Sequence, residues 1–195
     1  MTWEVRRSAD RFTTEREGSV TRYCFSFGHH YDPTNVSFGP VVAVNDETVQ
    51  PGGGFGLHRH AGLVIVTYVV RGSLAHQGIS QATVGPGSLA VLRCGAGVEH
   101  AEVNAGDAEL RFVQTWLTAR DGDVSYTVGA DEVRVGEAVV TAGRLAAQTF
   151  TGHLFVARGS ARAGEEQLLE GDSVRTAEPV VLVPDVDAEL VLVSW

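Results

Sequence analysis

The chain has little of several features that define large protein classes. It has only two cysteines, Cys24 and Cys94, and neither belongs to a CxxC motif, so a disulfide framework is excluded. No segment holds about 18 consecutive apolar residues, as a membrane-spanning helix needs, and the first residues, MTWEVRRSADRF, lack the apolar run of a signal peptide. We therefore expect a protein of the reducing cytoplasm with no membrane contact.

Basic residues are also scarce. The 15 basic residues, all of them arginines, are outnumbered by 24 aspartates and glutamates, which gives a net charge of −9. Nucleic-acid binding needs clustered lysine and arginine to neutralise phosphates, whereas the one basic stretch, from Arg6 to Arg16, is interrupted by acidic residues. We expect no direct contact with nucleic acid.

Helical periodicity is almost absent. Short runs rich in valine, leucine, threonine and phenylalanine recur instead, broken by many of the 23 glycines. Runs of this length with turn residues between them are typical of β-sandwiches and β-barrels. The predicted fold class is therefore all-β, and only two segments are weak candidates for helices, Ala9–Arg16 and Val133–Ala138.

A faint internal repeat divides the chain into two similar units. The matching segments are TYVVRGSLA from Thr67 and HLFVARGSA from His153, GPGS at 85–88 and EGDS at 170–173, and VQTW ending at Trp116 and LVSW ending at Trp195. Two barrels side by side explain this better than a solenoid, whose repeats are shorter. We predict an N-terminal barrel at residues 1–118 and a shorter C-terminal barrel at 119–195, with the boundary in Arg120–Asp131.

Four residues have the spacing of metal ligands: His58 and His60 in GLHRHAG, then His100 and Glu102 in GVEHAEVN. Side chains at positions i and i+2 of a strand point to the same face, so both pairs can line one interior. Three imidazoles and a carboxylate suit iron, manganese, copper, nickel or zinc, and they suit magnesium or calcium poorly. The alternative is a set of buried histidines satisfied by hydrogen bonds, with Glu102 at the surface.

The second unit lacks this set. The repeat places Leu145 and Ala147 near the positions of His58 and His60, and no histidine lies around Pro184–Val186. The C-terminal barrel is therefore expected to be structural, or to cover the first barrel.

Further residues near the histidines have two interpretations each. Val64, Val66, Tyr68 and Val70 share the parity of His58 and His60, and they would line an apolar pocket for a flat ligand or simply fill the barrel. His76 is either a group that orients a ligand or a turn histidine. We expect His29 and His30 to be structural, and Cys94 to be a redox-sensitive thiol or a small core residue.

Several segments together resemble the pirin family, a branch of the cupins. They are CFSFGHHYDP, FGPVVAVNDETVQPGGGFGLHRH, VTYVVRGSLAH and CGAGVEHAEVN, in this order between Arg6 and Trp116. The resemblance implies a bicupin, which is two cupin-type β-barrels packed face to face, with a single metal in the N-terminal barrel. The family's ligand positions correspond to His58, His60, His100 and Glu102, and all four are present.

The resemblance also implies an activity. Bacterial pirins are associated with quercetin 2,3-dioxygenase activity and eukaryotic pirins with transcriptional regulation. A dioxygenase of this kind would use one divalent transition metal, iron first and manganese, copper, nickel or zinc as alternatives, with O2 and a flavonol or other phenol as substrates. Glu102 would then also be the catalytic residue that accepts the flavonol proton.

Two other functions fit the same residues. One is a non-enzymatic, metal- or redox-responsive regulatory protein that binds a partner protein. The other is a structural zinc site closed by four protein ligands.

The chain departs from the family pattern close to the ligands. Val64 stands where pirins usually have glutamate, residues 76–80 read HQGIS where HxDSxG is usual, and residues 90–94 read AVLRC where QWMxAG is common. These changes surround the pocket and leave the ligands intact. They therefore affect the identity of the substrate more than metal binding.

Overall fold

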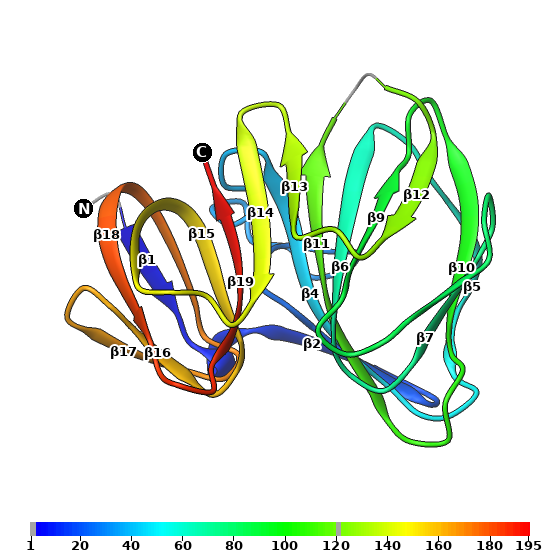
Figure 1. Ribbon diagram of the computed structural model, residues 1–195, viewed down its shortest axis with the longest axis horizontal. Helices are drawn as coiled ribbons and strands as arrows, with labels where there is room; N and C mark the ends of the chain where they lie inside the picture. Colours follow the sequence, from blue (N-terminus) through cyan, green and yellow to red (C-terminus); the bar gives the residue numbers. More distant parts are fainter. Residues whose placement is uncertain (1–2, 120–121) are drawn as a thin grey trace.

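The computed structural model describes residues 3–119 and 122–195, which form an all-β protein (Figure 1). The predicted fold class is confirmed. The strands form three sheets in which neighbouring strands are antiparallel. The described residues contain one short helical segment, the 3-10 turn η1 (Ser8–Asp10), and no helix that is long and apolar enough to cross a membrane.

The N-terminal barrel consists of a seven-stranded and a four-stranded sheet. The larger sheet has the order β12-β9-β6-β11-β4-β3-β2. Its strands are β2 (Phe12–Arg16), β3 (Ser19–Tyr23), β4 (Val41–Val49), β6 (Leu63–Arg71), β9 (Leu89–Arg93), β11 (Leu110–Thr118) and β12 (Ser125–Val128). The smaller sheet has the order β5-β10-β7-β8, with β5 (Gly54–His60), β7 (Leu74–Gln77), β8 (Ala82–Val84) and β10 (Val98–Asn104).

The C-terminal barrel is one eight-stranded sheet. Its strands are β1 (Trp3–Arg6), β13 (Glu132–Val135), β14 (Ala138–Gly143), β15 (Gln148–Arg158), β16 (Ser160–Ala163), β17 (Glu166–Leu169), β18 (Ser173–Pro184) and β19 (Glu189–Ser194). The main path is β13-β14-β19-β15-β18-β16-β17, and β1 pairs with β18. In Figure 1 this barrel lies on the left, and β13 and β14 adjoin the N-terminal barrel.

The internal repeat corresponds to the same strand order in both barrels. In the first unit the first repeated segment begins in β6, the second lies just before β9 and the third lies in β11. In the second unit the corresponding strands are β15, β18 and β19. The first unit has the local order β9-β6-β11 and the second has β18-β15-β19. Both repeats are therefore built around a central strand with equivalent neighbours.

Two strands join the barrel on the other side of the predicted boundary between residues 118 and 119. β1 is near the N-terminus but pairs with β18, with Trp3 opposite Thr176. β12 lies inside the predicted boundary stretch but pairs with β9, with Ser125 opposite Arg93. We propose a division into two units in which β1 belongs to the C-terminal barrel and β12 to the N-terminal barrel.

Both predicted helices are wrong. In the segment Ala9–Arg16 the first two residues belong to the 3-10 turn and the last five form β2. Threonine and phenylalanine favour this extended strand, which pairs with β3. In Val133–Ala138 the alternation of VRV forms β13, and Gly136 (φ 60°) makes the turn into β14. Tertiary strand pairing overrides weak helical periodicity in both segments.

The barrels pack against each other through an apolar core. Val64, Val66, Tyr68 and Val70 of β6 share one buried cluster with residues of the C-terminal barrel such as Val140. A second cluster fills the C-terminal barrel itself and also takes in the side chains of β1. The larger sheet of the N-terminal barrel therefore has an apolar outer face that the second barrel covers.

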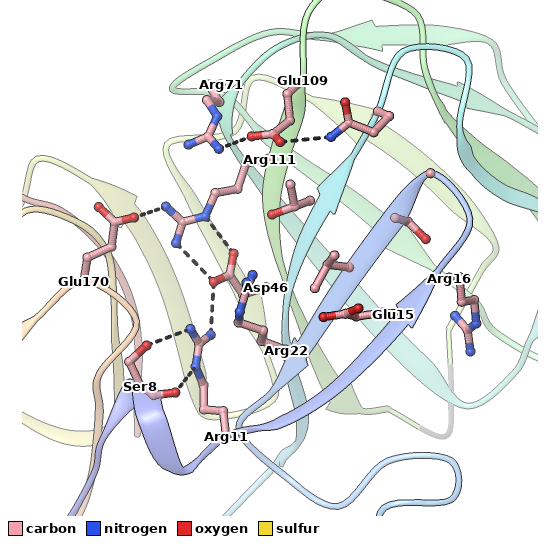
Figure 2. A pocket seen from close by; sticks show the side chains of 15 residues that line it. Ser8, Arg11, Glu15, Arg16, Arg22, Asp46, Arg71, Glu109, Arg111 and Glu170 are labelled. Atoms are coloured by element: carbon pink, nitrogen blue, oxygen red, sulfur yellow. Dashed lines mark hydrogen bonds and ion pairs between the residues drawn. The ribbon is translucent and has the colours of Figure 1, made fainter.

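A network of ion pairs lies beside this contact, around a polar cavity of about 700 Å³ (Figure 2). Buried Asp46 accepts hydrogen bonds from Arg111 (2.8 and 3.1 Å) and from Arg11 (3.0 Å), and Arg111 also pairs with Glu170 of the C-terminal barrel. Burial alone would raise the pKa of Asp46, but the hydrogen bonds and charges of the two arginines lower it overall. Asp46 is therefore ionised and forms two buried salt bridges, one with each arginine.

Buried His153 should make the protein acid-sensitive. Burial, followed by the charges of Arg175 and Arg6, lowers the pKa of His153 to about 3, whereas an unfolded histidine titrates near 6.5. Its contribution to stability is full above pH 6.5 and is lost as the pH falls towards 3, because only the unfolded chain takes up the proton. We expect a slope of roughly 1.4 kcal/mol per pH unit from this residue.

Urea unfolding between pH 7 and pH 4 measures this slope. His153→Leu should unfold with a weaker pH dependence than the unsubstituted protein, and a variant of exposed His29, His29→Leu, should not. Equal pH dependence for His153→Leu and the unsubstituted protein would contradict the assignment.

Candidate metal centre

Strands β5 and β10 bring the two predicted ligand pairs together. They pair antiparallel, with His100 opposite His58 and Val98 opposite His60. The ligand nitrogens of His58, His60 and His100 all lie within 4.8 Å of one another. Their ring centroids are 4.5 to 5.1 Å apart. It is the one group of three or more potential metal ligands found in residues 3–119 and 122–195.

A β-bulge shapes the strand that carries the first two histidines. Between His100 and Glu102 the chain of β10 advances by two residues, while β5 advances by three, from His58 to Phe55. The extra residue changes the parity of β5. Phe55 can therefore line the same cavity as His58 and His60, although it is an odd number of positions away, while Leu57 points to solvent.

The histidines are in the state that metal ligands require. His58 Nδ1–H donates to the carbonyl oxygen of Gly56 (2.7 Å), which leaves Nε2 as the free nitrogen. His100 is 1% exposed, and neither of its ring nitrogens has a hydrogen-bond partner. Burial and the neighbouring histidines lower the pKa of His100 to about 3 and that of His60 to about 4. The rings of His60 and His100 are therefore neutral at pH 7.

Glu102 lines the same cavity but lies outside the group of atoms within 4.8 Å. The Nε2 amide of Gln114 donates to both carboxylate oxygens, at 2.9 and 2.7 Å. Burial raises the pKa of Glu102 to about 7, and the hydrogen bonds from Gln114 act against this. Its role as a ligand or a base stays a prediction.

Gln114 is itself held in one orientation. The indole Nε1–H of Trp116 donates to Gln114 Oε1 (3.1 Å), so the amide nitrogen must face Glu102. The Trp116 ring also packs edge-on against His60, with centroids 4.7 Å apart. Two neighbouring side chains of β11 therefore contact the ligand strands, Trp116 packing against His60 of β5 and Gln114 binding Glu102 of β10.

The cavity in front of the histidines has a volume of about 260 Å³. Aromatic rings and a few polar groups line it: Arg16, Thr21, Tyr23, Phe27, Asn45, Glu47, Phe55, His58, His60, Glu102, Gln114 and Trp116. The expectation that β6 supplies the apolar lining through Val64, Val66, Tyr68 and Val70 is wrong. These side chains face the C-terminal barrel, because the turn after His60 ends β5 and the parity of one strand does not carry over to the next.

The remaining histidines lie outside the ligand group. His76 is buried, its Nδ1–H donates to the Ser80 carbonyl (3.1 Å), and its ring stacks on Tyr126. Its centroid is 5.2 Å from that of His100, so it is a neighbour of the centre. His30 stacks on Phe12, with centroids 5.2 Å apart, as a structural histidine would.

Cys94 is fully buried in an apolar cluster, and burial raises the pKa of its thiol to about 11. The thiolate is the reactive form of cysteine. Cys94 is therefore a core residue.

A comparison with family models decides the classification. The model described as Pirin matches residues 5–117, more than half of the chain. The chain belongs to the pirin family. The resemblance inferred from the sequence is confirmed, and with it the cupin fold.

Among curated relatives, this pirin is 40% identical over 119 residues to a Mycobacterium bovis protein provisionally named a quercetin 2,3-dioxygenase. The alignment covers 60% of this chain and 49% of the relative. It is 31% identical over 106 residues to a quercetin 2,3-dioxygenase of Escherichia coli, covering 53% of this chain and 46% of that protein. The chain spans about half the length of the curated relatives that it matches.

Solved structures extend the likeness to the C-terminal barrel. A bacterial pirin from Escherichia coli, solved in complex with nickel(II), has a TM-score of 0.86 over 98% of both chains at 21% identity. A quercetin 2,3-dioxygenase from Acinetobacter baumannii has a TM-score of 0.70 at 14% identity, covering 98% of this chain and 78% of that chain. At these identities the likeness shows a shared fold.

The cavity residues of this pirin that sequence reasoning missed include three buried polar ones, Asn45, Glu47 and Gln114. All three are at most 5% exposed. The sequence did indicate that polar residues are buried in this strand, because NDE interrupts a run of valines. Buried polar groups need partners or a function. The residues that face them come from strands distant in sequence, so the signal could not indicate what they do.

Proposed function

We propose that this pirin is a metal-dependent dioxygenase that acts on a phenolic substrate, with His58, His60, His100 and Glu102 as the metal ligands. The observation that carries the proposal is His100, because both of its ring nitrogens are buried without a partner beside two further imidazoles. A buried polar atom without a partner costs roughly 1–3 kcal/mol. A metal ion bound by one of these nitrogens would offset that cost.

The donor set fits the proposed metal. Three neutral imidazoles and a carboxylate suit first-row transition metals, and we propose iron, with manganese, copper, nickel and zinc as alternatives. When bound, such a metal would supply a Lewis acid for the oxidation of a phenol by O2. The likeness to a pirin solved in complex with nickel(II) supports a transition metal as the bound ion.

The protein groups around the metal would bind and orient the phenol. Tyr23, Phe27, Phe55 and Trp116 line the cavity and would hold a flat ring and exclude water from it. A carboxylate oxygen of Glu102, which faces the same cavity, would accept the hydroxyl proton of the phenol. Gln114 would keep that carboxylate in place through its two hydrogen bonds.

Oxygen uptake against a panel of flavonols and catechols tests the proposal. We expect protein purified without added metal to contain about one transition-metal ion per chain and to consume O2 with at least one phenol of the panel. Metal-replete protein that consumes no O2 with any member would refute the oxygenase. A zinc ion closed by four protein ligands would also refute it.

A further inference from the structure

The wall of the cavity that faces the histidines carries two polar side chains of β4. Asn45 and Glu47 line the cavity, whereas Asp46 and Thr48 line the polar cavity of the ion-pair network on the other face of the sheet. This alternation follows from the two-residue period of a strand. β4 belongs to the seven-stranded sheet and the ligand strands to the four-stranded one (Figure 1), so the two walls lie opposite each other.

Both side chains are buried and poorly partnered. Asn45 is 3% exposed, and its Oδ1 atom has no hydrogen-bond partner among the described residues. Glu47 is 4% exposed, and the hydrogen bond found for its carboxyl group comes from the Thr21 hydroxyl. Buried polar groups in native proteins are usually paired. Because both side chains line the cavity, they are placed near any group that enters it.

The chemistry of the wall indicates what that group is. Asn45 and Glu47 both line the cavity, and amide and carboxyl oxygens accept hydrogen bonds from hydroxyl groups, as Glu47 does from the Thr21 hydroxyl. The ligand expected here is a hydroxyl donor.

The remaining lining and the volume restrict the ligand further. The aromatic side chains Tyr23, Phe27, Phe55 and Trp116 favour a flat ring system. The volume of about 260 Å³ lies just below the usual range of small-molecule pockets, roughly 300–1,000 Å³. One or two rings fit this space better than a large ligand.

We propose that Asn45 and Glu47 form a hydroxyl-recognition subsite, which selects phenols of one or two rings that carry a second hydroxyl group away from the metal. This inference rests on the proposed binding of a phenol in the cavity. In this arrangement the ring lies among the aromatic side chains, with one hydroxyl group directed to the histidines and another to β4. The two residues determine specificity and take no part in the chemical step.

Calorimetric binding measurements under nitrogen test the subsite without turnover. The ligands are a matched pair of two-ring phenols, one with a hydroxyl group on the distal ring and one without it, and the protein is the full chain as purified. When a ligand lacks the hydroxyl group that would bind these buried acceptors, the acceptors stay unpaired. The affinity for such a ligand is then roughly tenfold lower. We expect the unsubstituted protein to bind the hydroxylated ligand about tenfold more tightly.

Substitutions in β4 should remove this preference selectively. In Asn45→Leu the ratio of the two dissociation constants should fall to about two or less, and in Glu47→Gln, which keeps an acceptor, it should stay near the unsubstituted ratio. Thr48→Val is the matched control on the opposite face of the same strand and should leave the ratio unchanged. If Asn45→Leu does not fold, Asn45→Ala, which adds no bulk, takes its place.

The outcomes separate the subsite from the proposed activity. An unchanged ratio in the Asn45 variant, or no preference in the unsubstituted protein, overturns the subsite even if O2 is consumed. A preference that depends on Asn45 supports the subsite even if no O2 uptake occurs, and in that case the oxygenase alone is refuted.

Discussion

Replacing His100 with leucine should abolish metal binding and oxygen uptake while leaving the metal-free protein at least as stable as before. His100 contributes two buried nitrogens without partners, so without a metal it destabilises the fold. Leucine removes the unpaired atoms and keeps most of the volume. We expect the free energy of unfolding of the metal-free protein to rise by about 1 kcal/mol and metal affinity to fall by at least about a hundredfold.

Elemental analysis after dialysis and urea unfolding of metal-free protein measure the two effects. His29→Leu is the matched control, since His29 is exposed and outside the ligand group, and it should change neither quantity. The unsubstituted protein should gain stability when the metal is added, and His100→Leu should not. Metal retained at full stoichiometry by His100→Leu would remove this residue from the ligand set.

Replacing Asp46 with alanine should destabilise the protein by about 3–5 kcal/mol, the range found when one partner of a buried ion pair is removed. Asp46 is 2% exposed and binds two arginine side chains that are themselves 5% and 7% exposed. Without the carboxylate both guanidinium groups remain buried. Arg111 keeps its pair with Glu170, and Arg11 keeps its hydrogen bonds with Ser8 and its position over the ring of Phe155.

Urea unfolding at pH 7 measures this loss. The exposed pair of Glu132 and Arg134 provides the control, because Glu132→Ala removes a similar bridge in solvent and should cost about 0–1 kcal/mol. The lowered pKa of Asp46 stabilises the fold at pH values above the pKa of the carboxyl group in the unfolded chain, and this stabilisation is lost as the pH falls below the pKa in the folded protein. Asp46→Ala should therefore lose this part of the acid sensitivity. A loss below 1 kcal/mol would show that water replaces the carboxylate.

The ligand histidines could be located from the sequence because their geometry is local. His58 and His60 lie on one strand, and the two-residue period alone places them on one face. Strand pairing then brings His100 opposite His58, and the resemblance to pirins correctly indicated that the two segments meet. Most of the glycine-bounded valine runs became strands for the same local reason.

The rest of the cavity depends on contacts that local patterns do not contain. The parity argument failed for Val64, because the chain turns after His60 and enters another sheet. The bulge opposite Ala101, which brings Phe55 into the cavity, leaves no recognisable mark in the residues GFGLH. Asn45 and Gln114 acquire a role only when β4 and β11 are placed opposite β5 and β10.

The exchange of β1 and β12 has a consequence for how this protein can be shortened or recombined. A fragment that ends at residue 118 would lose the edge strand of the sheet behind the metal centre and keep an orphan strand that belongs elsewhere. It would also expose the valine face of β6 to water. The C-terminal barrel is thus an integral wall of the N-terminal one, and we expect the two to fold as one unit.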